Sequence, residues 1–475
     1  MRSLLLLLFL ASPLPAQPPD WFFAQLGDSQ WMTYGLTAPP SFPHFANMTW
    51  QMTRWNPAPR YVAHVGDLTQ NGTPEEFQRG RWAMRLLGDI PWGVCIGNHD
   101  YRCGLSSIPS YACAAEWRRW MGPENFVNYV DTPEGTVMFL HLEWDPRDLE
   151  SLEFARSKLE ANPGYPVVLV MHRFLSRPLG TPSGGYYTSG FVEVGGSRLD
   201  GAGVNSPHDV WMKLVEPYPQ VFMVINGHGY NIVRDTKTTR FGREVQLHCF
   251  NLQDDPWGGA GYVRLYRFVG RAMIGYTFST SAQWPQFQHY GINRTDWFSI
   301  TLQHSVAEIA AEPPVWHAAP AEDTYIFPFW GGTSTRGSNN TISVSRGSIG
   351  EHGLIRFDLT GAPAVTQAVL TFTAEGNRAE GDGFTMHRML RPWSELDSWN
   401  TLGGLVAGVD YEAVPDLTFG AHGMGTFNVD VTRPIADWQA GAPNYGWCLV
   451  GGANETKIRT RDWHASTERP LLSIR

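Results

Sequence analysis

The sequence has little charge, few cysteines and no long apolar segment beyond its first residues. After residue 16, no stretch of its 475 residues is long and apolar enough to cross a membrane as a helix. Charged residues make up 17% of the chain, and the formal net charge is -9. Binding to a nucleic-acid backbone needs concentrated Lys and Arg, so this balance argues against nucleic acid as the main partner.

The five cysteines fit an oxidising compartment only in part. Cys103 and Cys113 bracket a short loop, and a disulfide between them would stiffen it. Cys95, Cys249 and Cys448 lie in apolar surroundings, where a thiol behaves as a small hydrophobic group. We therefore expect these three to be free and buried.

The first 16 residues have the pattern of a secretory signal peptide. Arg2 is followed by the apolar run from Leu4 to Leu10, and small residues end the segment at Ala16. The segment is too short to be a stable membrane anchor. The alternative is an N-terminal helix of the fold. The pattern predicts a soluble mature protein that is secreted or periplasmic.

The length of the chain predicts two or three domains, and 43% hydrophobic residues fit a folded globular protein. We expect an α/β domain over residues 17–302, a linker rich in Pro and Ala over 303–322, and an all-β domain over 323–475. Within the first domain, periodicity predicts a hairpin over 126–142, a helix over 148–159, and antiparallel strands over 239–250, 261–269 and 272–277.

Polar side chains follow five apolar runs of the first domain. The blocks at the ends of these runs are Asp28-Ser29-Gln30, Gly66-Asp67, Gly97-Asn98-His99-Asp100, His172 and Gly227-His228-Gly229-Tyr230. In open α/β sheets the loops past the strand ends converge on one crevice. Five runs that end in Asp, Asn or His suit a cluster that holds metal ions.

This ordered set of blocks resembles the calcineurin-like metallophosphoesterases, whose pattern is D-x-H, GD, GNH[DE], a strand-end His and GHxH. The resemblance covers roughly residues 20–280. It implies a four-layer α/β/β/α sandwich. It also implies hydrolysis of a phosphoester by water that is activated at two metal ions, either divalent or mixed-valence, with Mn, Fe and Zn as the candidates.

By this resemblance, Asp67 bridges the two ions, since one carboxylate has two oxygens and a charge that holds cations together. Asn98, His172 and His228 complete the site of one ion. His99 faces the scissile bond, where it donates a proton to the leaving oxygen or steadies the phosphate, and Asp100 holds its tautomer.

The site of the other ion takes Asp28, Asp67 and the residues at positions 30 and 230, and here the chain departs from the pattern. Gln30 and Tyr230 stand where the pattern has His. Three interpretations stay open. Tyr230 binds the metal, or Asn231 or His248 replaces it, or only one ion is held tightly.

Two features beside the ligands have alternative interpretations. Arg173 follows a ligand and is either a phosphate clamp or a surface arginine. Residues 176–206 are rich in Gly, Pro, Ser and Tyr, and they form either a substrate loop or a disordered surface insertion.

The all-β region resembles the DNRLRE-type jelly-roll modules of secreted proteins, some of which bind polysaccharide. The resemblance rests on Asp323-Thr324-Tyr325-Ile326, Arg356-Phe357-Asp358-Leu359, the segment around Trp393 and Trp399, and Arg469-Pro470-Leu471-Leu472. The two tryptophans could stack on sugars, but core packing is the favoured interpretation because a Trp buries a large area.

The sequence thus predicts a secreted metal-dependent phosphohydrolase of a small-molecule phosphoester, with diesters or nucleotide-like pyrophosphates favoured over monoesters. The alternative is a catalytically weakened phosphoesterase fold that binds a glycan or a surface through its β-sandwich. Six residues are retained that a decayed enzyme does not need, which favours the enzyme: Asp28, Asp67, Asn98, His99, His172 and His228.

Overall fold

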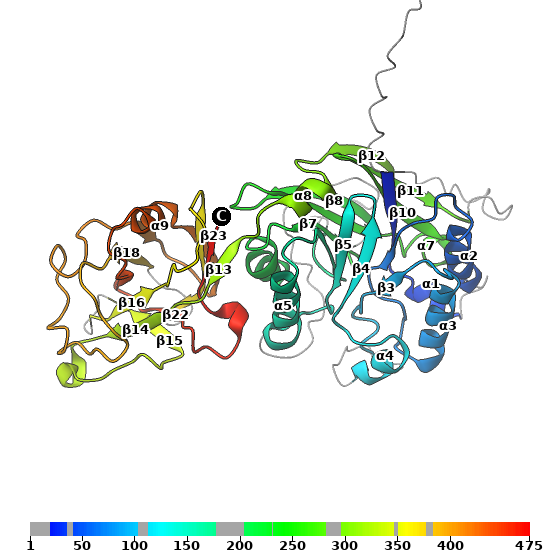
Figure 1. The fold of residues 1–475 in the computed structure, drawn as a ribbon. Helices are drawn as coiled ribbons and strands as arrows, with labels where there is room; N and C mark the ends of the chain where they lie inside the picture. The colour runs from blue at the N-terminus through cyan, green and yellow to red at the C-terminus, as the bar shows by residue number, and fades with distance from the viewer. Residues whose placement is uncertain are drawn as a thin grey trace, which may run out of the picture.

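The computed structural model describes residues 20–35, 41–102, 113–176, 204–229, 231–281, 296–345, 350–376 and 383–475. An α/β body and a β-rich C-terminal body lie side by side (Figure 1). The predicted signal peptide, Cys103, Tyr230 and residues 177–203 of the predicted loop lie outside the described residues. Within the described ranges, no helix has both the length and the apolar character needed to cross a membrane.

The α/β body contains two six-stranded sheets. Their strand orders are β12-β11-β10-β1-β2-β3 and β4-β5-β6-β7-β9-β8. Neighbours among β1, β2 and β3, and among β5, β6, β7 and β9, run parallel. The strands are β1 (Asp20–Leu26), β2 (Val62–His64), β3 (Trp92–Val94), β4 (Phe126–Thr132), β5 (Gly135–His141), β6 (Val167–Val170), β7 (Val221–Asn226), β8 (Asn231–Thr238), β9 (Glu244–Asn251), β10 (Tyr262–Val269), β11 (Ala272–Ser279) and β12 (Asp296–Thr301).

Helices cover the outer face of each sheet. The first sheet packs against α1 (Gln30–Tyr34), α2 (Phe42–Met52), α3 (Pro74–Arg85) and α4 (Ala114–Trp120). The second packs against the π-helical turn η2 (Asp148–Leu152), α5 (Glu153–Ala161), α6 (Pro207–Val210) and the π-helical turn η3 (Trp211–Val215). The short α7 (Pro256–Gly259) follows β9.

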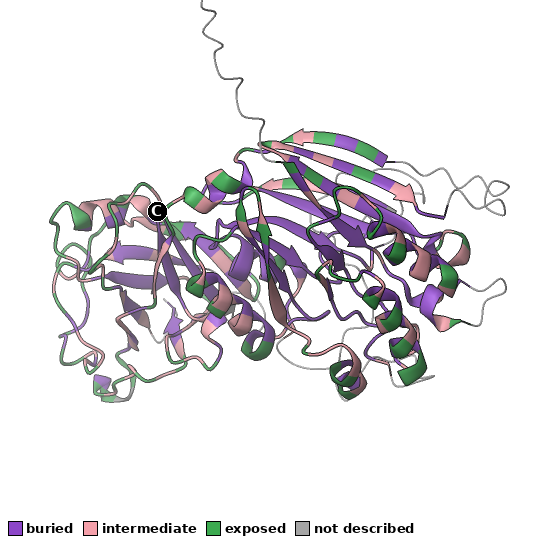
Figure 2. Cartoon of the chain, turned by 45° about the vertical axis from the view of Figure 1, so that its right-hand side comes forward, coloured by how far each residue is buried: buried purple, intermediate pink, exposed green. Residues whose placement is uncertain are grey.

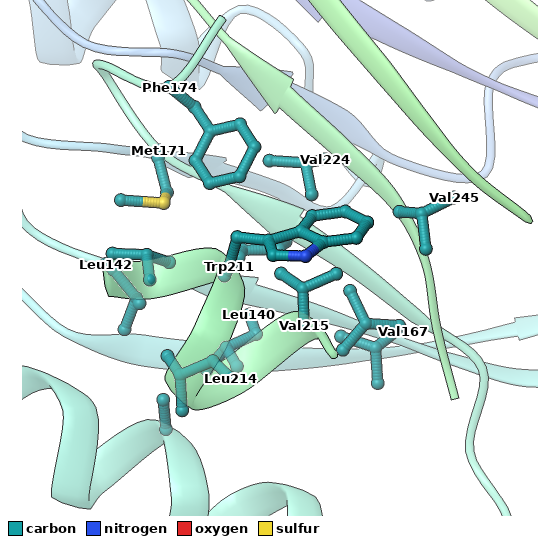
Figure 3. Packing of buried hydrophobic residues seen from close by; sticks show 14 of the residues in the cluster. Leu140, Leu142, Val167, Met171, Phe174, Trp211, Leu214, Val215, Val224 and Val245 are labelled. Atoms are coloured by element: carbon teal, nitrogen blue, oxygen red, sulfur yellow. The ribbon is translucent and has the colours of Figure 1, made fainter. Parts of the chain in front are cut away.

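Three apolar layers hold this body together. Phe23 and Phe139 belong to the core between the two sheets. Phe77 of α3 belongs to the core under the first sheet. Trp211 of η3 lies among residues of the second sheet such as Val224 (Figure 3). The strands are mostly buried, whereas the helices expose one side (Figure 2). The arrangement confirms the predicted four-layer α/β/β/α sandwich.

Local sequence explains these elements. Helix α3 begins with a capping box in which Thr73 accepts from the backbone of Glu76, while Pro74 occupies the first turn. Its buried face includes Phe77 and Met84, and each such side chain contributes about 2 kcal/mol when fully buried. Strand β6 is apolar and buried throughout, as expected for a parallel strand covered on both faces.

The predicted elements between the blocks were found with some shifts. The hairpin over 126–142 is formed by β4 and β5, and the helix over 148–159 by η2 and α5. The strand expected from residue 239 begins later, at Glu244. Residues 239–242 form the turn between β8 and β9, closed by a hydrogen bond from Gly242 N to Thr239 O at 2.9 Å.

Residues 303–322, for which a linker is predicted, contain regular structure. Helix α8 (Val306–Ala311) begins at a capping box between Ser305 and Glu308. Strand β13 (Trp316–Ala318) pairs with β23 of the C-terminal body. The segment therefore joins the two bodies through hydrogen bonds, and the predicted domain boundaries stay predictions.

The C-terminal body is a β-sandwich, as predicted. One sheet has the order β13-β23-β17-β22-β15 with β20 beside β17, and the other has the order β14-β16-β21-β18-β19. The remaining elements are β14 (Glu322–Ile326), η5 (Phe329–Gly332), β15 (Thr341–Val344), β16 (His352–Arg356), β17 (Ala368–Gly376), β18 (Phe384–Arg388), β19 (Leu417–Phe419), β20 (Gly425–Asp430), α9 (Thr432–Gln439), β21 (Trp447–Gly451), β22 (Thr456–Arg459), η7 (Ser466–Glu468) and β23 (Leu471–Ile474). Trp393 is buried and donates to Tyr445 O at 2.7 Å, so core packing accounts for this tryptophan.

Polar contacts fasten the sandwich to the α/β body. Lys213 is buried, and its Nζ lies 2.8 Å from Asp148 Oδ1 and 3.4 Å from Glu468 Oε1 of the sandwich. The hydroxyl of Thr467 donates to the same Asp148 oxygen at 2.6 Å. Ser466 N donates to Glu153 Oε1 at 2.8 Å. A buried lysine held by two carboxylates fixes how the two bodies meet.

Candidate metal centre

The loops after the parallel strands bring the predicted ligands together. Asp67, His172 and His228 each offer one ligand atom, and these atoms lie within 4.8 Å of one another. His172 Nε2 is 3.3 Å from Asp67 Oδ1 and 3.1 Å from Asn98 Oδ1. Side chains from residues as far apart in the sequence as 67 and 228 thus lie close together.

Hydrogen bonding and charge prepare His172 to bind a cation. Its Nδ1 lies 2.8 Å from Val65 O, which can only accept, so Nδ1 carries the hydrogen and Nε2 faces the cluster. Burial lowers the pKa of His172, but the carboxylates of Asp67 and Asp28 outweigh it and raise the pKa to about 9. Positive charge is therefore favoured at this position.

The carboxylate of Asp67 stays ionised despite its burial. Burial raises the pKa of Asp67, but His172 and His99 outweigh it and hold the pKa well below its ordinary value. His228 behaves in the opposite way, because burial and the charge of His172 lower its pKa to about 3. The centre thus offers an anionic oxygen and a neutral imidazole, both of which are metal ligands.

The motif glycines allow the loops to pack this closely. Gly66 has a φ of +104°, and a Cβ there would lie 2.5 Å from His172 Nδ1. A Cβ on Gly97 would lie 2.3 Å from Asp67 Oδ1. Any larger residue at either position would push a ligand away, which explains why glycine precedes Asp67 and Asn98.

The second half of the centre is built around Asp28 and Gln30. Asp28 accepts from His228 N at 3.2 Å and from Asn251 Nδ2 at 2.8 Å. Gln30 Nε2 lies 3.4 Å from Asp67 Oδ2 and also contacts Gln253 Oε1. Burial raises the pKa of Asp28 well above its ordinary value, an effect that His172 only partly offsets.

Asn251 and Gln253 were missed by the sequence reasoning. Asn251 ends β9 and Gln253 follows it, much as the predicted ligands follow their strands, and that position was the signal that could have found them. His248, a predicted alternative ligand, does not join the cluster. Its ring lies in the core between the sheets, and the centroid of the ring is 5.2 Å from that of Tyr266 and 5.4 Å from that of Phe298. Asn231 begins β8.

His99 lies beside the cluster, but its predicted partner is different. Its backbone N donates to Asp67 Oδ1 at 2.9 Å, and its Nε2 is 3.9 Å from Asp67 Oδ2. Its Nδ1 bonds Gln70 O at 2.9 Å, so the tautomer is set by a backbone carbonyl and not by Asp100.

Asp100 instead ties two ligand loops together. Its carboxylate accepts from the backbone of Gly97 at 2.9 Å, Leu68 at 3.2 Å and Thr69 at 2.8 Å, and from the hydroxyl of Thr69 at 2.8 Å. The buried carboxylate thus bonds peptide N–H groups of two loops and not the imidazole of His99. Asp100 is therefore a positioning residue.

Arg173 is buried and not a surface arginine. Its Nη1 lies 3.5 Å from Asp145 Oδ1. His64 is the last residue of β2, the strand that Asp67 follows, and its Nε2 lies 2.8 Å from Ser29 Oγ. It thereby links the loop that carries Asp28 and Gln30 to β2.

The cysteines agree with the prediction for the three thiols. Cys95, Cys249 and Cys448 are free and buried, and Cys113 takes part in a disulfide.

The residues of the centre fit divalent metal ions. Carboxylate, imidazole and amide oxygens converge there, and Gln30 Oε1 is buried without a hydrogen-bond partner. An orphaned amide oxygen beside two carboxylates is expected where a cation binds. The ligand types suit Mn, Fe or Zn.

Comparison with known proteins agrees with this chemistry. Residues 23–229 match the family described as Calcineurin-like phosphoesterase. A Bacillus subtilis (strain 168) protein named YvnB, described as uncharacterized, is 22% identical over 268 residues, which make up 50% of this chain and 18% of that protein. This chain therefore spans less than a fifth of that relative.

Solved phosphoesterase structures are similar only at a low level. A purple acid phosphatase from yellow lupin (Lupinus luteus) seeds is 16% identical with a TM-score of 0.39, and the match covers 64% of this chain and 57% of that chain. The calcineurin-like phosphoesterase YfkN from Bacillus subtilis is 10% identical with a TM-score of 0.32, and covers 61% and 92%.

The four layers, the ligands that converge after the strands and the family match lead to one conclusion. Residues 23–229 match a calcineurin-like phosphoesterase domain, and the side chains that converge in it fit metal ions.

Proposed function

We propose that this chain is an exported phosphohydrolase that uses two metal ions to cleave phosphodiesters or nucleotide-like pyrophosphates. The observation that carries the proposal is the convergence of Asp67, Asn98, His172 and His228. Metal ions held there would neutralise charge on the phosphoryl oxygens and lower the pKa of water.

The orientation of the Asp67 carboxylate is evidence that the centre holds two ions and not one. Its Oδ1 lies 3.3 Å from His172 Nε2, and its Oδ2 lies 3.4 Å from Gln30 Nε2. One carboxylate oxygen therefore faces each half of the centre. Asp67 would hold both ions, with His172, His228 and Asn98 on one side and Asp28 and Gln30 on the other.

His99 is the residue that handles a proton at the leaving group. Because Gln70 O only accepts, Nδ1 of His99 carries a hydrogen, and Nε2 is the atom that exchanges a proton with the leaving oxygen. The side chain of His99 is 18% exposed, whereas that of His172 is fully buried. A substrate can thus reach His99 while the ligand beneath it stays out of solvent.

Charge supports the preference for diesters. A phosphomonoester has a second pKa near 6 and carries close to two negative charges at neutral pH, whereas a diester carries one. Arg173 is the buried cation next to a ligand, and its charge is already shared with Asp145. Among the described residues, this arginine therefore has less charge to offer a phosphate than a free arginine would, which favours the substrate with the single charge.

Paired chromogenic substrates test this proposal. The protein is stripped with chelator, reloaded with Mn, Fe, Zn or Ca, and assayed on the bis- and mono-(p-nitrophenyl) phosphates. We expect metal-dependent hydrolysis with kcat/KM higher for the diester. Faster monoester hydrolysis would refute the diester preference, and activity that persists with chelator would refute the metal mechanism. Export is tested by finding the chain, shortened near residue 16, outside the cytoplasm.

A further inference from the structure

The second half of the metal centre has an unusual donor set. The family pattern places histidines at positions 30 and 230, and this chain has Gln30 and Tyr230 there. The described residues that surround Asp28 and Gln30 include two more amides, Asn251 and Gln253. These amides come from the end of a strand that the sequence pattern does not use.

Sheet order places these amides at the centre. β9 runs parallel to β7, with Cys249 paired to Asn226. The residues that follow β9 therefore emerge at the same edge as His228, which follows β7. Asn251 Nδ2 donates to Asp28 Oδ2 at 2.8 Å, and Gln253 N donates to Asn251 Oδ1 at 2.9 Å. Asn251 thus orients both Asp28 and the turn that carries Gln253.

The Gln30 amide shows where a cation would bind. Its nitrogen faces Gln253 Oε1 and lies 3.4 Å from Asp67 Oδ2, while its own oxygen is buried without a hydrogen-bond partner. A half-turn of the terminal amide exchanges its nitrogen and oxygen. Three oxygens, from Gln30, Gln253 and Asp67, would then face one another, an arrangement that a bound cation stabilises.

We propose that Gln253 is a metal ligand, and that with Gln30, Asp28 and Asp67 it forms an all-oxygen site for a hard divalent cation, Mn²⁺ or Mg²⁺. A site made of carboxylate and amide oxygens alone suits such ions, whereas Zn²⁺ sites in proteins usually include nitrogen or sulfur ligands. The other half of the centre, with His172 and His228, has the imidazoles that Zn or Fe accept. This inference rests on the proposed two-ion function and names the ligand that replaces a missing histidine.

Metal binding to the full-length protein tests the proposal without an activity assay. Apo protein is dialysed against Mn²⁺, bound Mn is counted per chain by mass spectrometry, and EPR reports whether two Mn²⁺ ions are magnetically coupled. The variant Gln253→Leu keeps the side-chain volume but removes the oxygen. Gln253→Glu keeps the oxygen. The matched control is Gln246→Leu, which changes a buried glutamine of β9 that accepts a hydrogen bond from Thr236.

We expect two coupled Mn²⁺ ions in the wild type, in Gln253→Glu and in Gln246→Leu, and one uncoupled ion in Gln253→Leu. Two coupled ions in Gln253→Leu would overturn the role of Gln253 and leave the proposed function standing. One ion in the wild type would overturn this second site and the two-ion part of the proposed function, and would leave metal-dependent hydrolysis standing. No bound ion in the wild type would overturn the proposed function as well. Circular dichroism of Gln253→Leu shows whether the fold is retained. If the fold is lost, Asn251→Ala is measured in its place, and we expect that variant to lack the magnetic coupling between two Mn²⁺ ions. Coupled ions in Asn251→Ala would then overturn the proposal.

Discussion

Replacing Asp100 by Asn tests whether the metal centre depends on the link between two ligand loops. The Asp100 carboxylate accepts four hydrogen bonds, two through each oxygen. Oδ1 accepts from the backbone and the hydroxyl of Thr69, and Oδ2 accepts from the backbone of Gly97 and Leu68. An amide has one oxygen, so it can keep only one of these two sets intact.

The structure indicates which set is lost and what the loss costs. The amide nitrogen is best placed toward Thr69, because that hydroxyl can turn and accept. The N–H of Thr69 then has no acceptor, which costs about 1 to 3 kcal/mol when buried. Losing the charge also weakens the bonds from Gly97 and Leu68, by roughly 1 kcal/mol together. Together these losses are about 2 to 4 kcal/mol. They are opposed by the cost of the buried charge, because burial raises the pKa of Asp100 to about 7 and its ionisation at pH 8 costs the wild type roughly 4 kcal/mol. We therefore expect the stability of Asp100→Asn near pH 8 to match or exceed that of the wild type, while the loops that carry the ligands lose their link.

The measurement is urea unfolding of the metal-free protein near pH 8, because burial raises the pKa of Asp100 to about 7 and the wild type is then ionised. Mn²⁺ affinity of the same variant is measured by titration, and we expect it to fall because Asn98 follows Gly97. Asp131→Asn, an exposed change in β4, is the control and should shift stability by less than about 0.5 kcal/mol. Unchanged Mn²⁺ affinity in Asp100→Asn, or a stability near pH 8 about 2 kcal/mol or more below that of the control, would refute the reasoning.

Three further predictions concern other parts of the chain. Lys213→Met leaves the buried Asp148 without its cation and should destabilise the protein by about 3 to 5 kcal/mol in urea unfolding. Burial raises the pKa of Asp323 to about 7, so the free energy of unfolding should fall by roughly 2 to 4 kcal/mol as the pH rises from 3.8 to about 7. Urea unfolding of Asp323→Asn over the same pH range should lack this loss. His99→Asn should lower kcat/KM about 100-fold or more while bound metal per chain stays unchanged.

The sequence was sufficient for the part of the centre that depends on strand ends. Apolar runs that stop at Asp67, Asn98 and His172 predict both the strands and the convergence of the ligands, since parallel strands share one edge. The roles of Asp100 and Gln253 could not be predicted, because they depend on which loops pack together in three dimensions. Nothing in the sequence indicates that β9 lies beside β7.

The same limit applies where the two bodies meet. Pro and Ala after residue 303 predicted a linker, and composition says nothing about the capping box at Ser305 that begins α8 or about the pairing of β13 with β23. Pairing between residues some 150 positions apart is decided by the packed sandwich and not by local propensity.

The most direct test of the central claim is the metal content and hydrolytic activity of Asp67→Asn beside the wild type, both purified without chelator. The structure places Asp67 within 3.4 Å of groups on both sides of the centre, so this one carboxylate should hold both ions. We predict bound metal and diester hydrolysis in the wild type and the loss of both in Asp67→Asn. Full metal content and full activity in a folded Asp67→Asn would contradict the account.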